Sequence, residues 1–185
     1  MNIFYLHENP VVSAQMQCDK HVTKMTTESA QMLSTVHRML DGKPYRAPSK
    51  SGKRMIKKWD HPTLDNVLYT SVHPYHPCTT WTMLTDNNYL WHYDHFIALS
   101  QEYEYRYGRE HLSYTKLKDI LVEMPKNIPS GPLTPVALAM KENPECVNES
   151  DPLGSYRNFY QTKQHRFKMV WSKRPVPNWF QYECA

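Results

Sequence analysis

Glycine is scarce in this chain, with 5 glycines among 185 residues. Neither the GxxxxGK phosphate loop nor the GxGxxG dinucleotide fingerprint occurs, so a glycine-cradled nucleotide site is excluded. The sequence also lacks HExxH, GxSxG and the HxE and PCxxC pair of zinc-dependent base deaminases. Any phosphate site must therefore use side chains and helix ends.

The chain also lacks paired cysteines and long apolar runs. Its cysteines form no CxxC pair and lie far apart, at Cys18, Cys78, Cys146 and Cys184. The opening "MNIFYLHENP" is not an apolar leader, so we expect reduced thiols in a cytoplasmic protein with no structural zinc. No run approaches the roughly 20 apolar residues of a membrane span, so no membrane partner is expected.

Aromatic and histidine side chains are abundant. The chain has 13 Tyr, 5 Trp and 10 His, and 40% of its residues are hydrophobic. Much of the buried surface should therefore be amphipathic, which suits ligand binding. A net charge of +4 permits a polyanionic partner without requiring one. At this length we expect one domain over residues 1–185.

The hydrophobic pattern predicts a mainly α fold of four to five helices joined by long proline-rich loops. The first helix should run from residues 10–13 to Asp41, before Gly42. The basic loop 43–62 holds seven Lys or Arg and has a possible hairpin turn at Ser51-Gly52. The remaining expected elements are a short helix at 64–69, helices at 77–107, 113–124 and 152–171, a proline-rich wrap at 125–150 and an extended tail at 172–185.

A narrow polar stripe follows the first expected helix beside its apolar face. At 100° per residue the stripe falls within about 80°, and it comprises Gln17, His21, Lys24, Glu28, Gln31 and Thr35. Lys24 and Glu28 alone could be an ordinary i, i+4 pair on a solvated face. The two glutamines, the histidine and the threonine fit a half-buried wall better. We therefore place a candidate site there.

Three residues of this stripe are the candidate catalytic groups. His21 could serve as a general acid or base near neutral pH, and Glu28 could orient it or act as the base. Lys24 could hold a phosphate or serve as an amine nucleophile. The sequence leaves these roles open.

Other residues are candidates for holding substrate or phosphate. "HPYHPC" lies just before a helix that begins at Pro77, and the exposed backbone donors of such an end attract anions. Metal binding there would need further ligands, so no metal or cofactor is predicted. With the basic loop as a cationic rim, the expected contacts are Gln17, Gln31, His73, His76, Thr79, Arg157 and Lys163.

Several unusual blocks carry a resemblance. They are "MNIFYLHENPVVSAQMQCDKHVTKM", "HPCTTW", "YRYGREH", "IPSGPLTP" and "RPVPNWF". Together they resemble a family of small uncharacterised proteins of tailed bacteriophages, including the cyanophage type, over nearly the whole chain. The resemblance implies a viral source and expression in the cytoplasm of a bacterial host. Phage accessory enzymes of this size often act on nucleotides or DNA, and we use this as an analogy.

The first functional hypothesis is a phage accessory enzyme of nucleic-acid metabolism that acts on a nucleotide or a DNA base. It would either transfer an amine or amino acid onto an activated pyrimidine, or excise a base as a glycosylase does. The alternative is a non-enzymatic protein that binds a nucleotide or nucleic acid to counter host defence. A third possibility is a buried polar network without chemistry.

Overall fold

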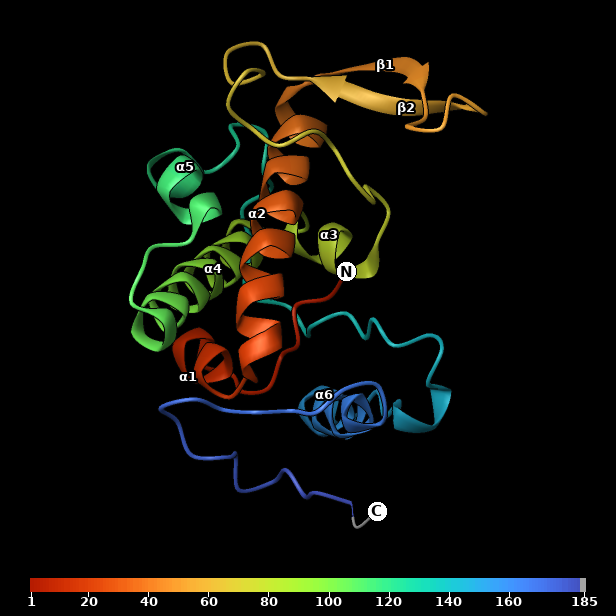
Figure 1. Cartoon of the computed structure of the whole chain (residues 1–185). Coiled ribbons are helices and arrows are strands. Elements are labelled where there is room, and N and C mark those ends of the chain that lie inside the picture. Colours follow the sequence, from red (N-terminus) through yellow and green to blue (C-terminus); the bar gives the residue numbers. More distant parts are fainter. Residues whose placement is uncertain (184–185) are drawn as a thin grey trace.

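The computed structural model describes residues 1–183, so the last two residues of the expected tail, including Cys184, lie outside it. Six α-helices and one two-stranded sheet make up the fold (Figure 1), which is mainly helical with an added β-hairpin. The helices are α1 (Pro10–Gln15), α2 (Asp19–Asp41), α3 (Pro77–Thr82), α4 (Asp86–Tyr107), α5 (Leu112–Leu121) and α6 (Pro152–Gln161).

The two long helices α2 and α4 pack against each other at the centre (Figure 1). Helix α1 packs on α4, whereas α3 and α5 pack on α2. One hydrophobic cluster joins the amino-terminal segment, the start of α2, and α6, and includes Leu6, Val22 and Tyr156. A second cluster lies between the later part of α2, α4 and α5, and includes Leu33 and Phe96. No helix in the described part of the chain has both the length and the apolar character to cross a bilayer.

The first helix is not continuous, contrary to the sequence expectation. Cys18 is extended, with a ψ of 162°, and separates α1 from α2. The Arg106 guanidinium donates to the carbonyl oxygens of Gln15 and Gln17 at distances of 3.1 and 2.9 Å, which satisfies the acceptors freed by the break. A residue distant in sequence therefore stabilises the interruption.

The expected helix 77–107 is also divided. Thr85 is extended, and its hydroxyl accepts the Asn88 N–H at 3.1 Å, so it caps the start of α4. The expected end at Gly108 is confirmed, because Gly108 has a φ of 71°, a left-handed conformation that glycine adopts without strain. The break at 83–85 ends α3 after six residues.

The possible hairpin in the basic loop is confirmed, and it is a regular one. Strands β1 (Lys43–Pro48) and β2 (Met55–Asp60) pair antiparallel, with Lys43 opposite Asp60. The turn between them includes Gly52, whose φ is 71°. Trp59, which is 5% exposed, packs at the base of the hairpin. The rest of the hairpin projects from the body (Figure 1).

Three other expectations differ from the structure. Residues 64–69 form turns rather than a helix. The cap of α5 is His111, whose side chain accepts the Ser113 N–H, and not Ser113 itself. Helix α6 ends at Gln161 and continues only as a 3-10 turn, η2 (Thr162–His165), so it does not reach residue 171.

The two proline-rich segments are extended, as expected. The only helical turn within residues 125–150 is η1 (Pro144–Cys146), and the segment buries Val136 and Met140. Phe180 of the tail is buried against Trp171, with ring centroids 4.8 Å apart. Ala139 of the first segment lines the cavity described below.

Candidate functional site

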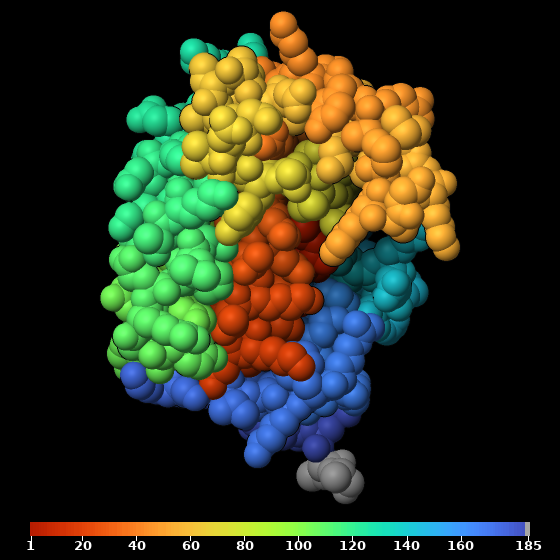
Figure 2. All heavy atoms as spheres, turned by 45° about the horizontal axis from the view of Figure 1, so that its top comes forward, coloured from red at the N-terminus to blue at the C-terminus, as the bar shows by residue number. Residues whose placement is uncertain are grey.

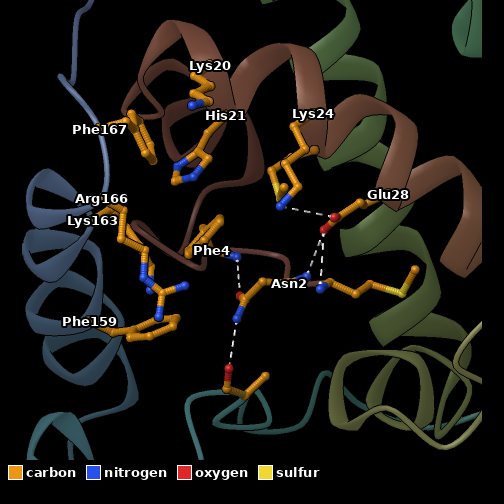
Figure 3. A pocket seen from close by; sticks show the side chains of 13 residues that line it. Asn2, Phe4, Lys20, His21, Lys24, Glu28, Phe159, Lys163, Arg166 and Phe167 are labelled. Atoms are coloured by element: carbon orange, nitrogen blue, oxygen red, sulfur yellow. Dashed lines mark hydrogen bonds and ion pairs between the residues drawn. The ribbon is translucent and has the colours of Figure 1, made fainter. Parts of the chain in front are cut away.

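A cavity of about 390 Å³ opens between the first half of α2, the amino-terminal segment and the end of α6 (Figure 3). The structure brings His21, Lys24, Glu28 and Lys163 to this one cavity. Its lining consists of Met1, Asn2, Phe4, Lys20, His21, Lys24, Met25, Glu28, Ala139, Phe159, Lys163, Arg166 and Phe167. The catalytic roles assigned to the α2 residues remain predictions.

Positive charge dominates the lining, which has a single carboxylate, Glu28. Glu28 is 15% exposed and lies 3.4 Å from the Lys24 Nζ and 3.7 Å from the Met1 amino nitrogen. It also accepts the Asn2 N–H at 3.1 Å. Lys24 itself is 59% exposed, so its ammonium lies at the mouth of the cavity. The result is one carboxylate held among amines.

His21 has a defined hydrogen-bonding state. Its Nδ1 is 2.8 Å from the Tyr160 hydroxyl, which already accepts the Cys18 N–H at 2.9 Å. Because Tyr160 is fully buried and His21 offers the acceptor, the hydroxyl donates to Nδ1 and the proton of the neutral ring is on Nε2. Burial, followed by the charge of Lys24, lowers the pKa of His21 to about 3. The His21 ring is thus neutral at pH 7, and its expected role as a general acid or base stays a prediction.

Phe4 forms an aromatic wall in a strained backbone conformation. Its φ is 53°, which is uncommon outside glycine, and its N–H donates to the Asn2 side-chain oxygen at 2.8 Å. The ring stacks on His21 with centroids 4.6 Å apart. Phe159 and Phe167 line other parts of the cavity. Such strain, of about 1–3 kcal/mol, is common at ligand sites.

Lys163 differs from the other cavity lysines in its surroundings. The residue is buried, and its Nζ lies 3.3 Å from the centroid of the Phe159 ring. Burial, followed by the charge of Arg166, lowers the pKa of Lys163 to about 8. About a tenth of this amine is therefore unprotonated at pH 7, far more than in an ordinary lysine.

Several of the expected binding residues do not line the cavity. Gln17 is buried and donates to the Ile3 carbonyl oxygen at 3.1 Å, and Arg157 donates to that of Leu6 at 3.1 Å. These two residues hold the amino-terminal segment in place. In this structure Gln17 and Arg157 position the amino-terminal segment and do not line the cavity.

The anion site expected at the start of α3 stays a prediction, and the structure shows where its residues lie. His76 caps this short helix by accepting the Cys78 N–H at 3.2 Å, so a main donor is already used. Thr79 is fully buried, and His73 is exposed. Gln31, on α2, is also outside the cavity lining. Of this set, His76 lines a neighbouring cavity of about 400 Å³, which shares Lys163 and Arg166 with the first.

A group of potential metal ligands lies at the other end of α2. Atoms of His37, Asp41 and His61 lie within 4.8 Å of one another. The His61 Nδ1 accepts the backbone N–H groups of Thr63 and Leu64 at 3.3 and 3.1 Å, which places the proton of the neutral ring on Nε2. That nitrogen then has no lone pair for a cation. We do not assign a metal to this group.

The sequence did not reveal the cavity walls that come from segments far from α2 along the chain. Met1, Asn2 and Phe4 come from the amino-terminal segment, and Arg166 and Phe167 come from the segment after α6. The single signal was the run of basic residues near the end of the chain.

Comparison with known proteins leaves the chain without an assigned family. No family model matches it, and no curated protein or solved structure is significantly similar.

Proposed function

We propose that this protein is an enzyme that acts on a base of DNA by glycosylase-type chemistry, in which an amine of the cavity attacks the sugar. The observation that carries the proposal is the position of the Glu28 carboxylate between two amines. It lies 3.4 Å from the Lys24 Nζ and 3.7 Å from the Met1 amino nitrogen. Base excision through an imine needs an amine and a carboxylate that handles protons, side by side.

The charge of the cavity supports a phosphate-bearing substrate. Lys20, Lys24 and Arg166 supply cations, and Phe4 adds a surface on which a base can stack. The volume of about 390 Å³ is at the small end of the range for ligand pockets. One nucleotide unit suits this volume better than the two substrates of a group-transfer reaction.

The reaction follows from the groups present. An unprotonated amine attacks C1′ of the deoxyribose, and the bond from C1′ to the base breaks with its electron pair leaving on the base. The new ammonium gives a proton to Glu28, which passes a proton to the departing base. The C1′–O4′ bond then opens as the nitrogen and C1′ form an imine, and the second proton of the nitrogen passes through Glu28 to O4′. Water hydrolyses the imine and restores the amine.

Two other amines are candidates for the nucleophile besides the Lys24 assigned from the sequence, and only one of them, the Met1 amino group, lies beside Glu28. Lys163 is buried and has a pKa lowered to about 8. Lys24 is largely exposed and is better placed to bind phosphate at the mouth. His21 can donate its Nε2–H to a substrate oxygen or to the base.

A test that does not need the natural base uses DNA with an abasic site. Any enzyme with an amine nucleophile forms an imine with the exposed C1′ aldehyde, and sodium borohydride reduces that imine to a stable adduct. We expect a covalent complex, and mass spectrometry of its peptides identifies the amine. Glu28→Gln should slow adduct formation about 100-fold, as the loss of a general acid or base does. Lys116→Met, a surface change outside the cavity, should have no effect.

The second candidate is a protein that only binds a nucleotide, and the excess of cations in the cavity favours it. The Glu28→Gln variant distinguishes the two candidates, because it should improve a binding protein and impair an enzyme. In a binder, loss of the carboxylate removes repulsion of phosphate, so affinity for a nucleoside monophosphate should rise. In an enzyme, the same change should slow turnover about 100-fold. Absence of an adduct, together with tighter binding by the variant, would refute the enzymatic proposal.

A further inference from the structure

The β-hairpin has a high density of positive charge that the protein does not neutralise. Residues 43–60 include seven cations. Within residues 1–183, none of these seven side chains forms a salt bridge. Arg46 lies directly opposite Lys57 in the register, and both are exposed. Like charges that face each other across two strands destabilise the pair. Lys57 also lies over the Trp59 ring of the same strand, with its Nζ 5.1 Å from the ring centroid. The facing of Arg46 and Lys57 across the strands is nevertheless a charge pattern that opposes strand pairing.

The hairpin is attached firmly at its base and projects beyond it. Arg38 donates to the Trp59 carbonyl oxygen at 2.9 Å and also pairs with Asp65. Trp59 is buried, whereas most residues nearer the turn are exposed. A two-stranded ribbon is marginally stable alone, so this base fixes its direction. The charged part is thus presented to solvent in a defined orientation.

The hairpin and the cavity lie along the same helix. Glu28 borders the cavity and Asp41 ends α2 next to β1, a separation of roughly 20 Å at 1.5 Å per residue. Figure 2 shows the hairpin beside the exposed face of α2, with the segment that follows α6 on the same side. In a duplex, roughly 20 Å is about six base pairs at 3.4 Å each. One DNA molecule can therefore contact both places.

We propose that the hairpin binds the phosphate backbone of the same double-helical DNA whose nucleotide enters the cavity. The inference rests on the proposed function, because it takes DNA as the substrate of the cavity. A rigid ribbon with fixed cations suits phosphates at fixed spacing, and β-ribbons lie in DNA grooves in known complexes. Single-strand binders instead present several aromatic platforms. Along the two strands only Tyr45 is an exposed aromatic residue.

The experiment measures binding of a fluorescent 20-base-pair duplex by anisotropy across a range of salt concentrations. The Arg46→Gln/Lys57→Gln variant should weaken binding about 10-fold at 0.1 M salt and reduce the slope of log K against log salt by about 2. Lys50→Gln/Lys53→Gln changes the turn alone and should act similarly without altering strand pairing. Lys116→Gln/Lys118→Gln removes the same charge from α5 and should bind as the unmodified protein does.

Two outcomes overturn the inference. Hairpin variants that bind the duplex as tightly as the α5 variant exclude the hairpin as the contact. An equal loss of affinity for duplex and for a single strand of the same length excludes the duplex as the preferred partner. Borohydride trapping on a single-stranded abasic trinucleotide, too short to span both places, tests the cavity separately. The hairpin variants should retain that adduct, whereas failure of the proposed function would remove it from every variant.

Discussion

Acid should unfold this protein between pH 5 and pH 4, because four histidines are buried in their neutral form. Burial lowers the pKa of His21 and His92 to about 3, and that of His37 and His95 to about 4. None of the four is more than 5% exposed. In the unfolded chain each titrates near its ordinary value of about 6.5.

The sign of the effect follows from proton binding. Since the folded pKa lies below the unfolded one, the unfolded chain binds more protons between the two values. The contribution to stability is complete above about pH 6.5 and is lost as the pH falls toward the folded pKa. Each buried histidine then lowers the free energy of unfolding by about 1.4 kcal/mol per pH unit. The four together lower it by roughly 5 kcal/mol per pH unit below pH 5.5. Over two pH units the loss reaches roughly 10 kcal/mol, which exceeds the stability of a domain in the lower half of the usual range of about 5–15 kcal/mol.

The assay is urea denaturation followed by tryptophan fluorescence at a series of pH values from 7 to 4.5. The free energy of unfolding should fall with a slope near four protons below pH 5.5. His21→Gln should reduce the slope by about one proton, and the same change at the exposed His73 should leave it unchanged. A slope of one proton or less would refute the reasoning, because it would mean that these rings are already protonated or are hydrated in the fold.

Three further predictions concern single residues and are measured by urea denaturation at pH 7. Tyr160→Phe should cost about 1–3 kcal/mol, because it leaves the buried Cys18 N–H without its acceptor; no loss would mean that water replaces the hydroxyl. Arg106→Met should cost about 3–5 kcal/mol, since its guanidinium pairs with the buried Glu102 at 2.8 Å; a stable variant would show that a second cation suffices. Gly42→Ala should destabilise the hairpin base, because a Cβ would lie 2.8 Å from a backbone carbonyl oxygen of β2; an unchanged midpoint would contradict this crowding.

The local signals in the sequence were reliable where one residue determines the backbone. Gly108 ends α4, and Asp151 caps α6 by accepting the Gly154 N–H at 2.9 Å. The breaks after Gln15 and Thr82 were missed, because the flanking residues continue a helical pattern. In the first case the stabilising group is Arg106, which lies far along the chain. Helix periodicity reflects only neighbouring residues, so it cannot reveal a contact with a residue that is distant in the sequence.

The candidate site was predicted in part for the same reason. One helix face placed His21, Lys24 and Glu28 together, and all three line the cavity. Periodicity could not show that Gln17, on the same stripe, faces the amino-terminal segment. Nor could it place Lys163, which approaches only because α6 packs across the start of α2. Helix periodicity predicts a face, whereas the opposite wall depends on the tertiary fold.

The positioning residues explain why the cavity combines strain with charge. Gln17 and His95 both contact the Ile3 carbonyl oxygen, at 3.1 and 3.3 Å, which anchors the backbone next to Phe4. With that carbonyl fixed, Phe4 is held at a positive φ and its ring is stacked on His21. Relaxation of Phe4 would move the chain that brings the Met1 amino group to Glu28. Buried hydrogen bonds therefore stabilise an unfavourable backbone conformation, and this conformation keeps an amine and a carboxylate at one end of the cavity.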